Sequence, residues 1–301
     1  MMRSSKVIFE LHGGIGNQLF QYAAGSAYSE MRNCEVAFDI THIIVKSPRK
    51  SLISSENLPL VELGLPSWNI KGGNANLFFE KIIRQSPFLK KYFTQHIMSP
   101  KLFRTTYESK EVGYDSKLLS SNSKTFFGYF QTYKYCSERL RESLTCNLLN
   151  RKEPNWVQQL LAQIESENIL ILHARFFDKE VKNVYSNLSS DYYGDAIAAL
   201  KVENFYDQIW LLTNDNRYAE ETFSDELLCQ VKLIEPPKEV DDLSILHLMV
   251  AAENLVIANS TFSWWGAYLG KKNKNVVAPK EIFLDQPVPR DYYPPDWIQI
   301  C

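Results

Sequence analysis

Short hydrophobic runs alternate along this chain with segments in which hydrophobic residues recur at the spacing of a helix. Residues 7–11 form the first buried run, and a glycine-rich turn ends it. From Asn17 the hydrophobic positions follow a helical period as far as Asn33, and residues 35–39 form a second run. A strand, a tight turn, a helix and a strand in this order predict two neighbouring parallel strands.

The same alternation fills the second half of the chain. A helical pattern follows the first four of its hydrophobic runs, which favours a doubly wound parallel sheet. Between the two halves, residues 149–155 are polar and contain Pro154, so we expect the joint between two domains there. The runs that predict strands lie at 168–173, 208–213, 230–234, 254–258 and 275–278.

The expected fold is therefore α/β, with two Rossmann-like domains facing a central cleft. We expect the domains at residues 1–150 and 151–301, with packing of the C-terminal tail against the first domain left open. Residues 125–130 predict a further strand and residues 133–148 a helix. Residues 76–98 are interpreted as a solvated helix with one buried face, although their lysines and aromatic residues would also suit an anionic membrane surface.

Composition places the chain among ordinary globular proteins, because 45% of its 301 residues are hydrophobic and 23% are charged. Its net charge is −2, so no global field attracts nucleic acid, and we expect no nucleic-acid partner. Five cysteines without regular spacing argue against a disulfide scaffold or a zinc site. The chain shows neither a long apolar run nor a signal-peptide pattern, so we expect a soluble cytoplasmic protein.

Ligands in open α/β sheets bind beyond the carboxyl ends of the strands, so the loops after predicted strands carry the candidate chemistry. The first loop runs from His12 to Gln18, and its glycines let the backbone approach a ligand or a second domain. A plain tight turn with an asparagine cap is an equally supported interpretation. Asp39, after the next strand, would suit a ribose, but Leu19 occupies the third glycine position of the dinucleotide fingerprint.

The second loop is His173-Ala-Arg175-Phe-Phe-Asp178, directly after a buried run. A guanidinium at the carboxyl edge of a sheet can hold a phosphate through two parallel hydrogen bonds, which makes Arg175 the most informative residue of this loop. An ion pair between Arg175 and Asp178 is the structural alternative. His173 is interpreted first as a satisfied imidazole at a strand end.

Two further loops follow predicted strands. In Thr213–Asn216, Asp215 either accepts hydrogen bonds from a guanine ring or a ribose, or caps the following helix. In Asn259–Gly266, Ser260 and Thr261 lie at a predicted helix N-terminus, where hydroxyls and free N–H groups bind anions. The two adjacent tryptophans of this loop are interpreted as packing residues rather than as a sugar platform.

The sequence contains no Asp-x-Asp, the motif by which many sugar-nucleotide enzymes hold a divalent metal on the diphosphate. No Walker lysine follows the glycine turn, and no Ser-His-Asp or nucleophilic cysteine arrangement can be identified in the sequence. We therefore expect no metal site, and we expect Arg175 and helix-end N–H groups to neutralise a bound anion.

Five short motifs occur in order along the chain: Gly13–Tyr22, Gly128–Gln131, His173-x-Arg175, Asp191–Tyr193 and Ser260–Gly266. Together they resemble motifs of the bacterial α-1,2-fucosyltransferases of glycosyltransferase family 11. The resemblance implies a GT-B-type fold, with an N-terminal domain on the acceptor side and a C-terminal domain that binds GDP-L-fucose. It also implies an inverting transfer of L-fucose that requires neither a metal ion nor another cofactor.

The resemblance also implies roles for individual residues. Arg175 corresponds to the arginine that holds the donor diphosphate, and Asn17 to an asparagine that faces it from the N-terminal domain. Apart from the resemblance, Asp178 is the preferred base for the acceptor hydroxyl because it lies in the same loop as Arg175. The expected catalytic residues are Arg175, Asp178 and Asn17. The alternative bases are Glu180, Glu10 and His12. The donor-binding residues expected are Gly14, Gly16, Asn17, His173, Arg175, Asp215, Ser260, Thr261 and Phe262.

One departure from the family pattern falls on the Arg175 motif. The family usually reads His-x-Arg-Arg-Gly-Asp, whereas this chain carries Phe176 and Phe177 in place of the second arginine and the glycine. One cation is therefore missing from the expected site, and Lys179 is a candidate to replace it. This change bears on donor affinity, rate and linkage more than on the fold.

The expected function is transfer of L-fucose from GDP-L-fucose to a hydroxyl of a bacterial surface glycan, taken as O2 of a galactose. A lipid-linked acceptor of O-antigen biosynthesis is the family-based expectation, and it would bring the protein to the inner face of the membrane. Two rival functions are kept. One is an NAD-dependent oxidoreductase, and the other is a non-enzymatic carbohydrate-binding protein that uses Trp264, Trp265 and Trp297.

Overall fold

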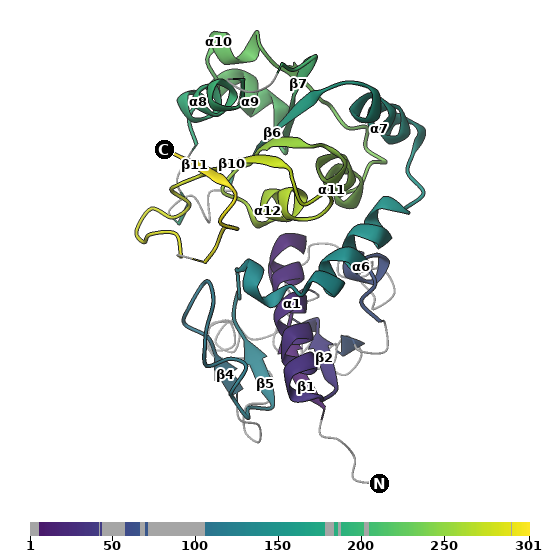
Figure 1. The fold of residues 1–301 in the computed structure, drawn as a ribbon, viewed down its shortest axis with the longest axis vertical. Helices are drawn as coiled ribbons and strands as arrows, with labels where there is room; N and C mark the ends of the chain where they lie inside the picture. The colour runs from purple at the N-terminus through teal and green to yellow at the C-terminus, as the bar shows by residue number, and fades with distance from the viewer. Residues whose placement is uncertain are drawn as a thin grey trace, which may run out of the picture. The chain divides into compact units, whose positions relative to one another are not determined.

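The computed structural model of the chain divides into two compact units, Met1–Leu140 and Arg141–Cys301, each of which is described by itself (Figure 1). Both contain a sheet whose strands are all parallel, with helices packed against it. The α/β class with two Rossmann-like parts is therefore confirmed. The structure describes residues 6–41, 43, 58–66, 70–71, 106–177, 184–185, 188–201, 205–289 and 291–301.

Unit 1 contains a sheet in the order β3-β2-β1-β5-β4. β1 pairs with β2 from Val7 opposite Val36 onwards, and α1 (Ile15–Arg32) connects these two strands as the sequence pattern predicts. Two short helices, α3 (Pro59–Glu62) and η3 (Tyr133–Tyr135), also belong to this unit. The strands are β1 (Val7–Glu10), β2 (Val36–Asp39), β3 (Ile70–Lys71), β4 (Thr106–Glu108) and β5 (Thr125–Phe127).

The core of unit 1 is aromatic. Phe9 stacks on Phe126 with ring centroids 4.7 Å apart, and both side chains are fully buried. Gly25 lets α1 lie directly on these rings, because a Cβ at this position would approach the Phe38 ring to 2.7 Å. α1 ends at Asn33, which adopts a left-handed φ of 45°. Close packing of α1 thus holds the glycine-rich turn at its N-terminus against the carboxyl ends of the strands.

Unit 2 contains a sheet in the order β11-β10-β9-β6-β7-β8. From β6 the chain runs outward through β7 and β8, then returns to the other side of β6 and runs outward again. This is the strand order of a Rossmann sheet, and its direction reverses between β6 and β9. The strands are β6 (Ile169–Ala174), β7 (Gln208–Thr213), β8 (Lys232–Leu233), β9 (Asn254–Val256), β10 (Asn275–Pro279) and β11 (Ile298–Ile300).

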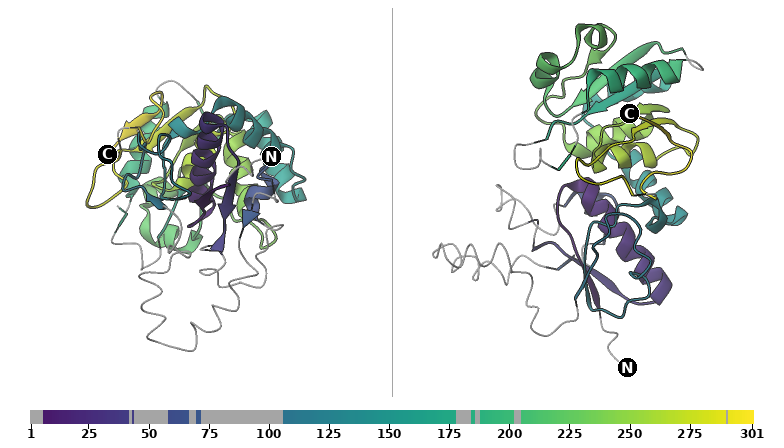
Figure 2. Two further views of the ribbon diagram at one scale, coloured as in Figure 1. Left: turned by 90° about the horizontal axis from the view of Figure 1, so that it is seen from below. Right: turned by 90° about the vertical axis from the view of Figure 1, so that its left-hand side faces the viewer.

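Helices cover both faces of the sheet of unit 2. Figure 1 and Figure 2 show α8, α9 and α10 on one face, and α11 and α12 on the other. β6 is buried along its whole length, which explains why its sequence reads as an unbroken hydrophobic run. The helices are α7 (Asn155–Ser166), α8 (Ser190–Lys201), α9 (Asn216–Thr222), α10 (Asp225–Leu228), α11 (Asp242–Ala251) and α12 (Thr261–Tyr268).

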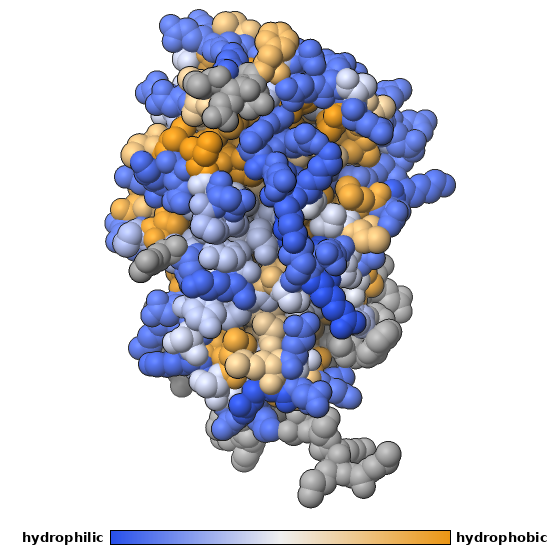
Figure 3. Space-filling model, viewed as in Figure 1, coloured by the Kyte–Doolittle hydropathy of each residue, from blue (hydrophilic) through white to orange (hydrophobic). Residues whose placement is uncertain are grey.

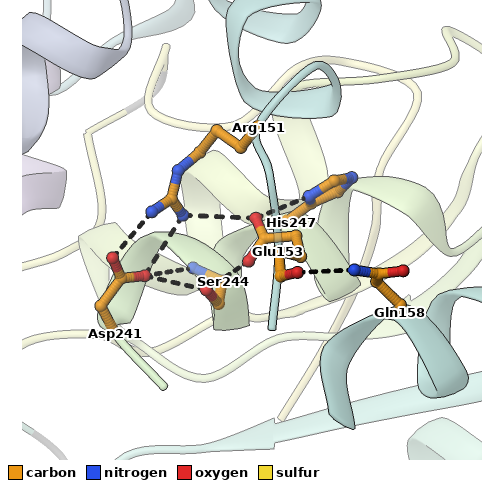
Figure 4. Close-up of polar contacts among 6 residues, drawn as sticks. All are labelled: Arg151, Glu153, Gln158, Asp241, Ser244 and His247. Atoms are coloured by element: carbon orange, nitrogen blue, oxygen red, sulfur yellow. Dashed lines mark hydrogen bonds and ion pairs between the residues drawn. The ribbon is translucent and has the colours of Figure 1, made fainter. Parts of the chain in front are cut away.

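The division between the units falls within α6 (Glu138–Leu149), rather than in the polar segment 149–155. That segment is held in unit 2 by its own charges. Arg151 donates two hydrogen bonds to Asp241 at the start of α11, at 2.7 and 3.2 Å. Glu153 is buried, accepts a hydrogen bond from the Ser244 hydroxyl and contacts Nδ1 of His247 at 3.0 Å (Figure 4). A polar segment that resembles a linker is therefore part of the second unit.

The C-terminal tail belongs to unit 2. β11 extends the sheet through β10, with Val277 opposite Ile298. Trp297 lies against Trp264 with ring centroids 5.6 Å apart. The sequence does not predict this strand, because its three residues are exposed or half-buried and form no hydrophobic run.

The described surface is mostly hydrophilic on the face drawn in Figure 3, where hydrophobic residues appear in separate groups. None of the described helices is both long enough and apolar enough to cross a membrane. The predicted amphipathic segment 76–98 lies outside the described residues.

Candidate functional site

The carboxyl ends of β6 and β9 define the candidate site of unit 2. In a Rossmann sheet, ligands bind outside the carboxyl ends of the strands where the strand order reverses, and here that point lies between these two paired strands. The loop after β6 carries Arg175, and the segment after β9 leads into Ser260 at the N-terminus of α12. Two motifs that the sequence analysis treated separately thus emerge at the same point of one sheet.

The N-terminus of α12 has the geometry of an anion site. Ser260 is the N-cap residue, and its side chain accepts a hydrogen bond from the Phe262 N–H at 3.3 Å. Thr261 begins the helix, and both hydroxyl residues are half-buried. The first turn of a helix leaves N–H groups without intrahelical partners, and the helix dipole favours negative charge there.

His173 connects the end of β6 to this helix. Its Nδ1 lies 2.6 Å from the hydroxyl of Ser263, in the first turn of α12. The imidazole ring also faces Phe262, with centroids 5.6 Å apart, and the backbone carbonyl of His173 accepts a hydrogen bond from Tyr193. The sequence interpretation of His173 as a satisfied imidazole at a strand end agrees with this contact.

Burial controls the protonation of His173. The side chain is enclosed, and desolvation together with the nearby positive charge of Arg175 lowers the pKa of His173 to about 3. The imidazole is therefore neutral near pH 7. The influence of the Arg175 charge also indicates that the two side chains belong to one electrostatic environment.

Arg175 itself is exposed, whereas the backbone after it is firmly held. The side-chain amide of Asn214 accepts a hydrogen bond from the Phe176 N–H at 2.8 Å and donates one to the Phe176 carbonyl at 3.1 Å. Asn214 follows β7, the neighbour of β6 in the sheet. This pair of hydrogen bonds fixes the backbone directly after Arg175, so Asn214 joins the site although the sequence analysis gave it no role.

The two phenylalanines that replace the expected arginine and glycine act as anchors. Phe176 packs edge-on against Tyr218, at 4.7 Å between centroids, and against Phe223 at 5.7 Å. Phe177 stacks on Tyr185 at 4.3 Å, with ring planes 8° apart. The loop therefore has aromatic contacts directly after Arg175 in place of a second cation.

Asp215 caps α9, which is one of the two interpretations that the sequence left open. Its side chain accepts a hydrogen bond from the Tyr218 N–H at 3.0 Å. Asp215 lies at the carboxyl end of β7, directly after Asn214. Its expected contact with a nucleotide stays a prediction.

The glycine-rich turn of unit 1 forms a second polar cluster. Gly14 is the N-cap of α1, Gly13 has a left-handed φ of 78°, and Gly16 is buried in the first turn. The Asn17 side-chain oxygen accepts a hydrogen bond from Gln131 at 2.9 Å. Gln131 closes the Gly128–Gln131 motif, so the structure joins two motifs that are 114 positions apart.

Gln21 links the same two motifs from inside unit 1. Its side-chain oxygen accepts a hydrogen bond from the His12 N–H at 2.9 Å, and its amide donates to the Gly128 carbonyl at 3.2 Å. The His12 ring lies between Phe127 and Tyr129, with centroids at 4.6 and 4.9 Å. These contacts give His12 a packing role. Glu10, another alternative base, is buried at the end of β1.

Two features bear on the rival functions. Asp39, the expected ribose partner of an oxidoreductase, accepts hydrogen bonds from the Thr41 N–H and hydroxyl at 2.9 and 2.5 Å. The three tryptophans proposed as a sugar platform are buried, with exposures of 0%, 0% and 7%, which contradicts that use of them. They are Trp264, Trp265 and Trp297.

Asp178, Lys179 and Glu180 lie outside the described residues, so the base candidates Asp178 and Glu180 stay predictions. Among the residues that are described, no three His, Cys, Asp or Glu side chains converge as metal ligands do. Ser244, Glu153 and His247 bring together residue types of a nucleophilic triad. However, Glu153 contacts the other two, and Ser244 makes no hydrogen bond to His247 within the described part of the chain (Figure 4).

Comparison with known proteins gives the class of the relatives of this chain. No family model matches the sequence. An alpha-1,2-colitosyltransferase of Escherichia coli is 29% identical over 311 residues, which cover 98% of this chain and 99% of the relative. The O-antigen biosynthesis glycosyltransferase WbnK of Escherichia coli is 26% identical over 300 residues, which cover 91% and 93%. These full-length relatives of the chain are glycosyltransferases.

Among solved structures, the fucosyltransferase NodZ from Bradyrhizobium matches with a TM-score of 0.45 and 16% identity, over 89% of this chain and 93% of its own. POFUT1 in complex with GDP matches with a TM-score of 0.45 and 12% identity, over 91% and 98%.

Proposed function

We propose that the protein is an inverting glycosyltransferase that moves L-fucose from GDP-L-fucose to a hydroxyl of a bacterial surface glycan. The acceptor hydroxyl is taken as O2 of a galactose. Five ordered motifs of the fucosyltransferase type support the donor, and full-length similarity to two glycosyltransferases supports the class of reaction. The observation that carries the proposal is that the loop with Arg175 and the segment leading to the α12 N-terminus follow the two paired strands at the reversal point of one Rossmann sheet.

In the proposed reaction the acceptor hydroxyl attacks the anomeric carbon of fucose while the bond to GDP breaks. Negative charge then grows on the leaving diphosphate. Arg175 and the N–H groups of the first turn of α12 stabilise that charge, and they require no reorganisation when the bond breaks. Because a cation and a helix N-terminus supply the neutralisation, we propose that transfer proceeds without a divalent metal.

The base that takes the proton of the acceptor hydroxyl is proposed to be Asp178, three residues beyond Arg175 in sequence. Asn17 is kept as a proposed donor-binding residue on the strength of the family resemblance. Its hydrogen bond to Gln131 supplies a reason for the two motifs to occur together.

A second candidate donor is GDP-colitose, because the relative with 29% identity over the full length is a colitosyltransferase. Colitose differs from L-fucose by the loss of one ring hydroxyl. A site that binds a hydroxyl through polar groups discriminates strongly against the analogue without it, whereas an apolar site discriminates weakly. The relative rates with the two donors therefore report how polar the sugar pocket is.

The proposal is tested by incubating the purified protein with GDP-fucose or GDP-colitose and a panel of galactose-terminated acceptors, in the presence of EDTA. We expect release of GDP together with a new glycoside, whose linkage NMR identifies as α-1,2. Transfer of neither sugar to any acceptor would contradict the proposal.

The same sample separates the rival functions. A ligand that binds only the folded state raises the melting temperature, so we expect GDP to stabilise the protein and NAD to leave it unchanged. Stabilisation by NAD alone would favour an oxidoreductase. Stabilisation by glycans without any response to GDP would favour a carbohydrate-binding protein.

A further inference from the structure

The hydrogen bond between Ser263 and His173 is fully enclosed. Ser263 has no exposed surface, and His173 is only 5% exposed. Their contact joins α12 to the end of β6 across 90 positions of sequence, at a distance of 2.6 Å between Oγ and Nδ1. Within the described residues this is the one hydrogen bond of the Ser263 hydroxyl.

The direction of this hydrogen bond follows from the need of the Ser263 hydroxyl hydrogen for an acceptor. If Ser263 donates to Nδ1, the hydroxyl hydrogen is paired and the imidazole carries its proton on Nε2. If Nδ1 donates instead, the hydroxyl hydrogen has no acceptor among the described residues. Because buried donors are almost always paired, the first arrangement is favoured.

The second ring nitrogen of His173 then becomes a donor. No polar atom of the described residues is paired with Nε2. The ring lies two positions before Arg175, on the strand that borders the reversal point of the sheet, and its neighbour in space is the first turn of α12. An Nε2–H group here adds a neutral hydrogen-bond donor to the cation and the helix N-terminus.

We propose that Ser263 is a positioning residue that holds His173 in the Nε2–H tautomer, so that this N–H donates to the diphosphate of the donor beside Arg175. The diphosphate rests on the proposed function, whereas the tautomer rests on the contact alone. Because the imidazole is neutral, its contribution does not require a proton from solution. A purely structural contact would hold α12 in place without selecting a tautomer.

The first test reads the tautomer directly. Protein labelled with ¹⁵N-histidine is examined by long-range ¹H–¹⁵N NMR, and the His173 signals are identified by their loss in His173→Gln. We expect the wild type and Ser263→Thr, which keeps a hydroxyl, to show Nε2–H. We expect Ser263→Ala to show a mixture of tautomers, and GDP to shift the Nε2 resonance of the wild type.

The second test is kinetic. Ser263→Ala is expected to lose about 10- to 100-fold in kcat/KM for the sugar nucleotide, the order expected for a hydrogen bond to a charged group. Ser263→Thr is expected to recover most of this loss. Ser244→Ala removes a buried hydroxyl of α11, which donates a hydrogen bond to Glu153, and serves as the matched control with unchanged kcat/KM.

The proposal is wrong if wild-type His173 is the Nδ1–H tautomer, or if Ser263→Ala keeps both the Nε2–H tautomer and the kcat/KM of the wild type. It is also wrong if GDP binds to the wild type without shifting the Nε2 resonance of His173. Failure of the proposed function has a different signature, because a protein that transfers no sugar can still show the Nε2–H tautomer and its loss in Ser263→Ala.

Discussion

At the scale of single residues, two side chains on one strand end have opposite environments. His173 is enclosed and neutral, whereas Arg175 is exposed and charged. Ala174 between them is the last residue of β6, and Arg175 begins the loop that follows it. In the proposed site, the neutral imidazole and the guanidinium would both donate hydrogen bonds to the diphosphate.

The depressed pKa of His173 makes folding sensitive to acid. The folded pKa of about 3 lies below the ordinary value of 6.5, so between these values the unfolded chain binds a proton that the folded protein does not. Stability must therefore fall as the pH drops from 6.5 towards 3. We expect His173→Gln to lose less stability than the wild type over this window, measured by urea unfolding at pH 7 and pH 4.5. An equal acid loss in both proteins would show that His173 is not enclosed as described.

Asn214 affects Arg175 through the backbone of Phe176. We expect Asn214→Ala to reduce kcat/KM about 3- to 10-fold, because each of its two hydrogen bonds contributes about 0.5–1.5 kcal/mol and both are partly exposed. Asn214→Asp keeps the acceptor for the Phe176 N–H and should be intermediate. The control is Asn122→Ala in unit 1, where the Asn122 side chain accepts a hydrogen bond from Arg32. Equal kinetics of Asn214→Ala and wild type would remove Asn214 from the site.

At the scale of elements, the two ends of α12 have different electrostatic surroundings. Arg141 donates a hydrogen bond to the Tyr268 carbonyl at 2.8 Å, and Lys274, whose pKa burial lowers to about 7, donates to the Gly266 carbonyl at 3.2 Å. Cations at the C-terminus of a helix interact favourably with its dipole. The N-terminus has no acidic residue in its first turn and remains open to an anion.

Arg141 is the cation whose removal tests this arrangement. It also donates to the Gly270 carbonyl at 3.3 Å and lies over the Tyr268 ring, 5.0 Å from the centroid. We expect Arg141→Ala to lower the free energy of unfolding by about 1–2 kcal/mol, since it loses charged hydrogen bonds at a partly buried position. Urea unfolding provides the measurement. Arg139→Ala, an exposed neighbour on α6, should be close to wild type, and equal losses in both variants would contradict the assignment.

At the scale of the whole molecule, the alternation of strands and helices predicted much of the architecture. Buried parallel strands such as β6 are continuous hydrophobic runs, so their positions could be read directly. β3 and β11 are only two and three residues long, and the residues of β11 are exposed or half-buried, which leaves little pattern to read. The two structural units divide between Leu140 and Arg141, whereas the joint was expected at 149–155, because the polar side chains that resemble a linker there pair with α11 in unit 2.

The candidate site could be predicted only in part. Arg175 and Ser260 were found because both follow strands and have the chemistry of anion binding. The strand order that brings them together is a property of the folded sheet and leaves no local trace in the sequence. Ser263 and Asn214 were missed for the same reason, since their partners lie 90 and 38 positions away. From the sequence, Phe176 and Phe177 indicate only that a cation is missing. In the structure, their rings pack against Tyr218 and Tyr185 and anchor the loop.

The central claim is that Arg175 binds the diphosphate of a guanosine nucleotide where the strand order of the unit 2 sheet reverses. Calorimetric titration of GDP in EDTA, with wild type, Arg175→Ala and Arg32→Ala, tests it most directly. We expect wild type and Arg32→Ala to bind alike, and Arg175→Ala to bind about 10- to 100-fold more weakly, in line with the loss of charged hydrogen bonds. GDP affinity that is unchanged in Arg175→Ala, or absent from the wild type, would contradict the account.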